Sequence, residues 1–89
     1  MAERPLRFTA HARTVMEERG IAETWVESAM ADPLLIEPDP TQPGALRAFA
    51  AVPAYGNRVL RVVYYDEPDA RRIITVFFDR GARNKGLTT

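Results

Sequence analysis

Two side chains are the clearest candidates for chemistry, namely the only histidine, His11, and an arginine within an apolar run, Arg61. His11 follows Thr9, whose hydroxyl group is a good helix N-cap, so His11 would lie in the first helical turn. The positive end of the helix dipole disfavours a second positive charge there. A neutral imidazole is able to accept a proton. We therefore predict a catalytic role for His11. The alternative is a packing role, with a hydrogen bond to a strand end or to the second helix.

Arg61 lies between Leu60 and Val62, where a charge is costly unless it is paired. We predict that Arg61 holds a phosphate group, because a guanidinium matches the geometry of phosphate. Other basic residues at strand ends and in the tail are predicted to form a nucleic-acid-binding rim: Arg58, Arg80, Arg83 and Lys85. The alternative for this rim is edge charge that keeps the protein soluble.

Composition excludes several classes of site. The chain of 89 residues has no cysteine, which removes disulfides, thiol catalysis and most zinc sites. Ser28 is the only serine, and no phosphate-binding glycine loop or metal-ligand spacing is present. We expect no cofactor and no metal. We also expect no signal peptide and no membrane span, which fits a cytoplasmic protein.

The net charge of zero conceals an asymmetry. Residues 1–44 carry four arginines against eight acids, whereas residues 45–89 carry seven arginines and one lysine against four acids. The two halves therefore have charges of −4 and +4, which would orient a partner.

Two short helices are predicted in the first third of the chain. The first spans Ala10–Arg19, with Thr9 as its N-cap and Gly20 as its C-cap. The second spans Glu23–Ala31 and ends before Pro33. The buried stripe of the first helix is predicted to comprise Ala12, Val15, Met16 and Arg19.

The rest of the chain is predicted to form a meander of strands. Three segments are rich in β-branched and aromatic residues: Leu46–Val52, Arg58–Tyr65 and Arg71–Phe78. Gly56 and Asn57 would form a two-residue hairpin turn, and Leu34–Glu37 would add a fourth strand. We therefore predict one α+β domain over residues 1–89. In it, two N-terminal helices pack on a three- to four-stranded antiparallel sheet, and the tail 80–89 is flexible.

Successive side chains of a strand point to opposite faces of the sheet, so the sequence predicts which residues share a face. The face beneath the helices would carry Phe49, Ala51, Leu60, Val62, Tyr64, Ile74, Val76 and Phe78. The opposite face would carry Val59, Arg61, Val63, Tyr65, Ile73, Thr75 and Phe77. The second face is too apolar to be left to water, so we predict a partner-binding surface formed by Val63, Tyr65, Ile73 and Phe77. The alternative is that the tail or the proline-rich loop covers it.

Several sequence segments together resemble a known family. These are "FTAHARTVMEERGI", a following helix that ends in "DP", "NRVLRVVYY" and "RIITVFF". From about Leu6 to Phe78 they resemble a small bacterial family catalogued as domain of unknown function 4258. His11 matches its histidine, Glu18, Arg19 and Gly20 match its "ERG", and Arg61 matches its strand arginine. Many members carry a basic residue one helical turn after the histidine, where this chain has Val15.

The resemblance extends to the fold of RelE- and ParE-type toxins, and it implies a function. Such proteins are often mRNA endonucleases that an antitoxin neutralises. They cleave RNA by attack of the 2′-hydroxyl on the adjacent phosphate, without a metal or cofactor. The resemblance thus implies an RNA-binding, toxin-type ribonuclease with His11 and Arg61 as catalytic residues and an antitoxin as partner. The alternative is a non-catalytic interaction module that uses its apolar outer sheet face to form a homodimer or to bind another protein.

Overall fold

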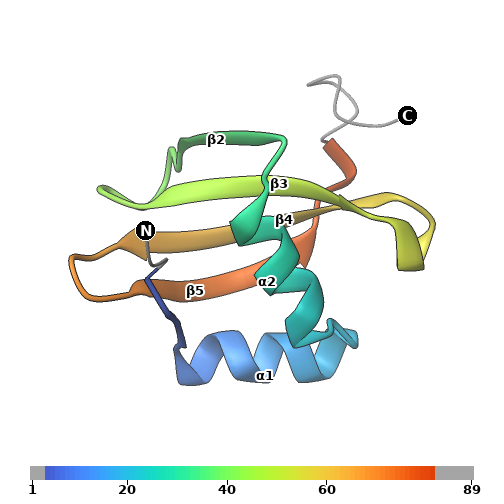
Figure 1. The fold of residues 1–89 in the computed structure, drawn as a ribbon, viewed down its shortest axis with the longest axis horizontal. Helices are drawn as coiled ribbons and strands as arrows, with labels where there is room; N and C mark the ends of the chain where they lie inside the picture. The colour runs from blue at the N-terminus through green and yellow to red at the C-terminus, as the bar shows by residue number, and fades with distance from the viewer. Residues whose placement is uncertain (1–3, 82–89) are drawn as a thin grey trace.

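The computed structural model describes residues 4–81, which form a five-stranded sheet with two helices (Figure 1). The order of strands is β1-β5-β4-β3-β2. The elements are β1 (Leu6–Phe8), α1 (Ala10–Arg19), α2 (Glu23–Ala31), β2 (Leu35–Pro38), β3 (Leu46–Val52), the short 3₁₀ helix η1 (Pro53–Tyr55), β4 (Arg58–Asp66) and β5 (Arg71–Phe78). The α+β class is confirmed. The sheet differs from the prediction because it has five strands and is mixed: β1 pairs with β5 in parallel.

Both helices occupy the predicted residues. The Thr9 Oγ1 atom accepts a hydrogen bond from the Ala12 backbone N–H at 3.1 Å, and Gly20 adopts the left-handed C-cap conformation with φ 66°. Val15 and Met16 face the core as predicted. Arg19, which was predicted to lie in the same stripe, is exposed instead.

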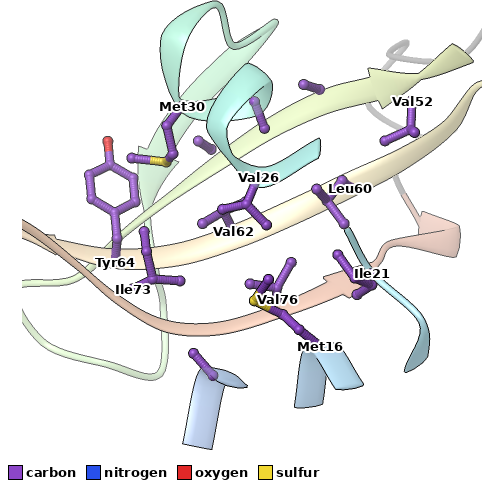
Figure 2. Packing of buried hydrophobic residues seen from close by; sticks show 14 residues of the cluster. Met16, Ile21, Val26, Met30, Val52, Leu60, Val62, Tyr64, Ile73 and Val76 are labelled. Atoms are coloured by element: carbon purple, nitrogen blue, oxygen red, sulfur yellow. The ribbon is translucent and has the colours of Figure 1, made fainter. Parts of the chain in front are cut away.

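The helices cover only one side of the sheet. α2 crosses that side, while α1 runs alongside β5, beyond the short strand β1 (Figure 1). The core between them is apolar, and Figure 2 shows how Met16 of α1 and Val26 of α2 meet Leu60, Val62 and Val76 of the sheet. We call the opposite side of the sheet the open face. It carries Phe49, Val59, Arg61, Val63, Tyr65, Arg72, Thr75 and Phe77.

The predicted facing of β3 is wrong by one residue. Phe49 lies opposite Arg61 on the open face, and Ala48 lies opposite Val62 beneath the helices. The cause is the connection between β3 and β4. It comprises the five residues 53–57, with η1 before Gly56 and Asn57, rather than a two-residue turn. The register therefore shifts by an odd number of residues, which exchanges the two faces of one strand.

A β-bulge changes the facing of β5 near its start. Val63 pairs with Thr75, whereas the next residue, Tyr64, pairs with Ile73, so that Ile74 is the extra residue. Ile73 consequently lies in the core with 0% exposure. The prediction that Ile73 belongs to the open face is wrong for this reason.

Candidate functional site

Arg61 lies in the middle of β4 and is held on the open face by two neighbours. Its Nη1 atom is 3.4 Å from Oδ2 of Asp79, and its guanidinium carbon lies 4.1 Å from the centre of the Phe77 ring. Burial lowers the pKa of Arg61, and the charge of Arg47 adds to this, while Asp79 opposes it. The Nε atom is buried and has no hydrogen-bond partner within residues 4–81. The Arg61 guanidinium is thus paired with Asp79 through Nη1, whereas its Nε donor lacks a hydrogen bond within residues 4–81.

A second arginine reaches the same aromatic ring from α1. The guanidinium carbon of Arg19, the last residue of α1, lies 5.9 Å from the centre of the Phe77 ring. Two cations that are 42 positions apart in the sequence therefore converge on one side chain. Sequence reasoning did not select Arg19 as a site residue, although its place in the "ERG" segment was a usable signal.

His11 is exposed on α1, and no hydrogen bond within residues 4–81 involves its side chain. The side chain that bonds to the sheet here is that of Thr9, whose Oγ1 donates to the Ile74 carbonyl of β5 at 3.3 Å. No contact within the described residues joins His11 to Arg61. Their relation is set instead by the direction in which α1 presents His11.

Helical geometry sets that direction. Successive residues of an α-helix are rotated by about 100°, so His11 lies about 160° from Arg13 and about 80° from Arg19 around the axis. Arg13 marks the side toward α2, because its Nη1 donates to Glu23 at 2.7 Å. By the same geometry Arg19 lies about 20° from the buried Ala12, and its side chain reaches Phe77 from the last residue of α1. His11 therefore lies on the side of α1 that faces away from α2, next to Val15.

Val15, which lies one helical turn after His11, is a buried packing residue. Val15 is 7% exposed and is one of the buried residues of α1. A cation at this position would have to extend past the core to reach water.

Arginines cover the remaining apolar residues of the open face. The guanidinium of Arg47 lies 5.6 Å from the ring centre of Phe49, and that of Arg72 lies 5.0 Å from the ring centre of Tyr65. Both cations are paired with acids. Arg47 donates twice to one oxygen of Glu37, at 2.6 and 2.9 Å, and Arg72 pairs with Glu67 at 3.0 Å. The open face is therefore a charged layer over aromatic rings.

This layer changes the predicted partner surface. Val63 lies on the open face but is only 4% exposed, and Ile73 lies in the core. Tyr65 and Phe77 are partly exposed, each beneath a guanidinium. The proline-rich loop reaches this face at one point, where the Tyr65 hydroxyl donates to the Pro43 carbonyl at 3.5 Å.

One residue of the predicted basic rim, Arg58, lies on the opposite side of the sheet from Arg61. Arg58 is three residues from Arg61 along β4, so alternation places the two on opposite sides of the sheet. Arg58 lies over the Tyr55 ring at 5.2 Å. Arg80 is exposed just after β5, and Arg83 and Lys85 lie outside the described residues.

Sequence reasoning also missed an aromatic cluster at the end of the sheet where Arg58 lies. Tyr55 stacks on Phe78 with ring centres 4.8 Å apart, and Trp25 lies 5.7 Å from Tyr55 and 6.2 Å from Phe78. Tyr55 is 44% exposed. The three rings come from α2, η1 and β5, so no local sequence pattern links them.

Other features lie apart from these residues. A hollow beside α1 is lined by Arg13, Thr14, Met16, Glu17, Ile21 and Glu23. In the described part of the chain, no group of three or more His, Asp or Glu side chains could hold a metal ion. No helix within residues 4–81 is long and apolar enough to cross a membrane.

Comparison with protein-family models gives one match, to the family described as "Domain of unknown function (DUF4258)", over residues 8–78. The matched region contains His11, Arg19 and Arg61. Comparisons with curated proteins and with solved structures gave no match.

Proposed function

The chain belongs to the DUF4258 family, and on this basis we propose that it is a metal-independent endoribonuclease of the RelE-like toxin type, acting on mRNA. One observation carries the proposal. His11 is exposed on the side of α1 away from α2, and Arg61, 50 positions along the chain, lies on the open face of the sheet beside that helix. Phosphodiester cleavage uses an acid–base group together with a group that binds the phosphate anion.

The chemistry is intramolecular. His11 accepts the proton of an RNA 2′-hydroxyl, whose oxygen attacks the adjacent phosphorus atom. The new P–O2′ bond forms as the P–O5′ bond breaks, which leaves a 2′,3′-cyclic phosphate and a 5′-hydroxyl that takes up a proton. Arg61 holds a phosphate group of the bound RNA on the sheet, because its guanidinium matches the geometry of phosphate. Its guanidinium stays charged at neutral pH, since arginine is effectively always protonated.

The test is cleavage of a single-stranded RNA by the purified protein in the presence of a chelator. We expect His11→Ala to lower the rate by about 10²- to 10⁴-fold, as for loss of a general base. Arg13→Gln is the matched control, because Arg13 is an exposed residue on the opposite side of α1.

Two checks separate catalysis from folding and from contamination. The urea midpoint of His11→Ala should equal that of the wild type, because no side-chain bond of His11 within residues 4–81 is lost. An RNA with a 2′-deoxy sugar at the cleavage position should resist the wild type. Equal cleavage by wild type and His11→Ala would remove His11 from the mechanism.

A different observation supports the second candidate, a non-catalytic interaction module that forms a homodimer or binds an antitoxin-like protein. The Trp25, Tyr55 and Phe78 rings lie together and partly exposed, with Arg58 over Tyr55. Trp, Tyr and Arg dominate the binding energy of protein interfaces. Light scattering of the wild type and Tyr55→Ala distinguishes the two candidates. A dimer that the substitution dissociates, without any RNA cleavage by the wild type, would favour the module.

A further inference from the structure

We infer that a row of alternating arginine and phenylalanine side chains across the open face is the track on which the backbone of a single-stranded RNA lies. The Arg–Phe row comprises Arg19, Phe77, Arg61, Phe49 and Arg47. The inference rests on the proposed function, because it specifies how the same face holds its substrate. It concerns binding, and so it is tested separately from cleavage.

Strand register forms the row. Phe49 of β3 lies directly opposite Arg61 of β4, which lies directly opposite Phe77 of β5. Residues that pair in this way project to the same side of a sheet. Arg19 extends the row beyond Phe77 onto α1, and Arg47 extends it along β3 from Phe49. Adjacent strands are about 4.8 Å apart, so the central part of the row, from Phe49 through Arg61 to Phe77, crosses three strands.

The rings hold the cations in place. Each guanidinium of the row lies over a phenylalanine ring, at 4.1 Å for Arg61, 5.6 Å for Arg47 and 5.9 Å for Arg19. A guanidinium stacked on a ring keeps its charge and its N–H donors while it loses conformational freedom. Three pre-positioned cations on one face match a ligand that carries several negative charges. The Arg61 Nε atom is a buried donor with no acceptor within residues 4–81.

The burial of the rings favours recognition of the backbone over recognition of the bases. Phe49 is 0% exposed, so a nucleobase has no access to its ring. Contacts to phosphates carry no sequence information. The row therefore predicts binding with little sequence preference and with strong salt dependence.

Two acids limit the affinity of the row. Asp79 pairs with Arg61, and Glu37 pairs with Arg47, so a phosphate competes with both carboxylates. Removing the charge of Asp79 should therefore strengthen RNA binding. Asp79 also accepts a hydrogen bond from the Gly81 backbone N–H through Oδ1, and an asparagine retains an oxygen for this bond.

The polarity of the track follows from α1. The Arg19 end of the row adjoins the helix that carries His11, whereas the Arg47 end lies next to β2. The phosphate that is cleaved lies beyond the Arg19 end, toward the start of α1, because His11 is eight residues, or about 12 Å, from Arg19 along the helix. The RNA on one side of the cleavage point extends across β4 and β3.

The experiment measures binding of a short single-stranded 2′-O-methyl oligoribonucleotide by fluorescence anisotropy over a range of KCl concentrations. This probe cannot be cleaved, because its 2′-hydroxyl is blocked. Each phosphate contact contributes about 0.7 to the slope of log K against log salt for a single strand. We expect Arg19→Gln and Arg47→Gln each to lower the slope by about 0.7 and Asp79→Asn to raise the affinity.

Arg13→Gln is the matched control. Arg13 and Arg19 are both exposed arginines of α1, and each lies over a phenylalanine ring, Phe8 for Arg13 at 4.4 Å. The control should keep the wild-type slope. Equal slopes of log K against log salt for Arg19→Gln and Arg13→Gln would show that the Arg–Phe row is not the RNA track. Unchanged or weaker RNA binding by Asp79→Asn would show the same.

Failure of the row and failure of the proposed function are distinguishable. If the wild type cleaves RNA but Arg19→Gln and Arg13→Gln have equal salt slopes, the Arg–Phe row is rejected and the proposed function is not. Binding that follows the row, without any cleavage by the wild type, would reject the ribonuclease and leave the row supported.

Discussion

Replacement of Thr9 by valine should destabilise the protein by about 2 kcal/mol, because one hydroxyl group joins α1 to the sheet. Thr9 Oγ1 accepts from the Ala12 N–H at 3.1 Å and donates to the Ile74 carbonyl at 3.3 Å. Loss of an N-cap costs about 1 kcal/mol, and loss of a further hydrogen bond costs about 1 kcal/mol. Valine has nearly the same shape, and Thr9 has the extended backbone (φ −69°, ψ 162°) that valine adopts readily.

Urea unfolding followed by Trp25 fluorescence measures this effect. With a slope of about 2 kcal/mol per M, the midpoint should fall by about 1 M. Thr9→Ser keeps the hydroxyl and should remain within about 0.5 kcal/mol of the wild type.

Thr14→Val is the control for the same chemical change in the same helix. The Thr14 hydroxyl also bonds to a backbone carbonyl, that of Ala10, but it is exposed and lies within the helix. Its loss should cost less than about 0.5 kcal/mol. Equally small effects of Thr9→Val and Thr14→Val would refute the reasoning that Thr9 connects α1 to β5.

Three further changes test the fold. Leu60→Ala should lower the free energy of unfolding by about 2–5 kcal/mol, measured with urea, because Leu60 is fully buried beneath the helices. Gly20→Ala should lower the free energy of unfolding by about 1–2 kcal/mol through its φ of +66° alone, since no neighbouring atom lies within 4 Å of an added Cβ. Burial acts to raise the pKa of Asp39, but hydrogen bonds from Thr41 and Gln42 and the charge of Arg47 outweigh it and lower the pKa below 3.8. Asp39 therefore adds stability above that pH and loses it as the pH falls through the folded pKa. Asp39→Asn should be slightly less stable than wild type in urea at neutral pH, and equally stable in strong acid.

Local signals predicted the helices well. Thr9 and Gly20 mark the ends of α1 with capping groups whose partners lie within the same few residues. Pro33 likewise limits α2, because proline constrains the residue before it. Such features depend on short-range geometry, which a single sequence contains.

Long-range features could not be predicted in the same way. The parallel pairing of β1 with β5 joins Leu6 to Arg71, and no local pattern specifies that partner. The five-residue connection after β3 and the bulge at Ile74 each change which side chains face the core. The connection placed Phe49 on the other side from the one predicted, and the bulge did so for Ile73.

The candidate site likewise combines features that local sequence predicts with features that depend on long-range contacts. His11 and Arg61 were chosen by residue type and by their position in an expected helix and strand. Arg19 was not, because its role depends on Phe77, which lies far away in the sequence. The register that aligns Phe49, Arg61 and Phe77 became visible only with the sheet.

The pairing of β1 with β5 also has a consequence for synthesis of the chain. Ribosomes add about 5–20 residues per second, and domains generally fold as units. α1 is placed by β1 and packs against β5, so its neighbours in the sheet are the first and the last strands to be made. A nascent chain that has reached the turn after β4 already contains Arg19, Arg61 and Phe49. It still lacks β5, against which α1 packs and which carries Phe77, so the Arg–Phe row is complete only after β5 has been made.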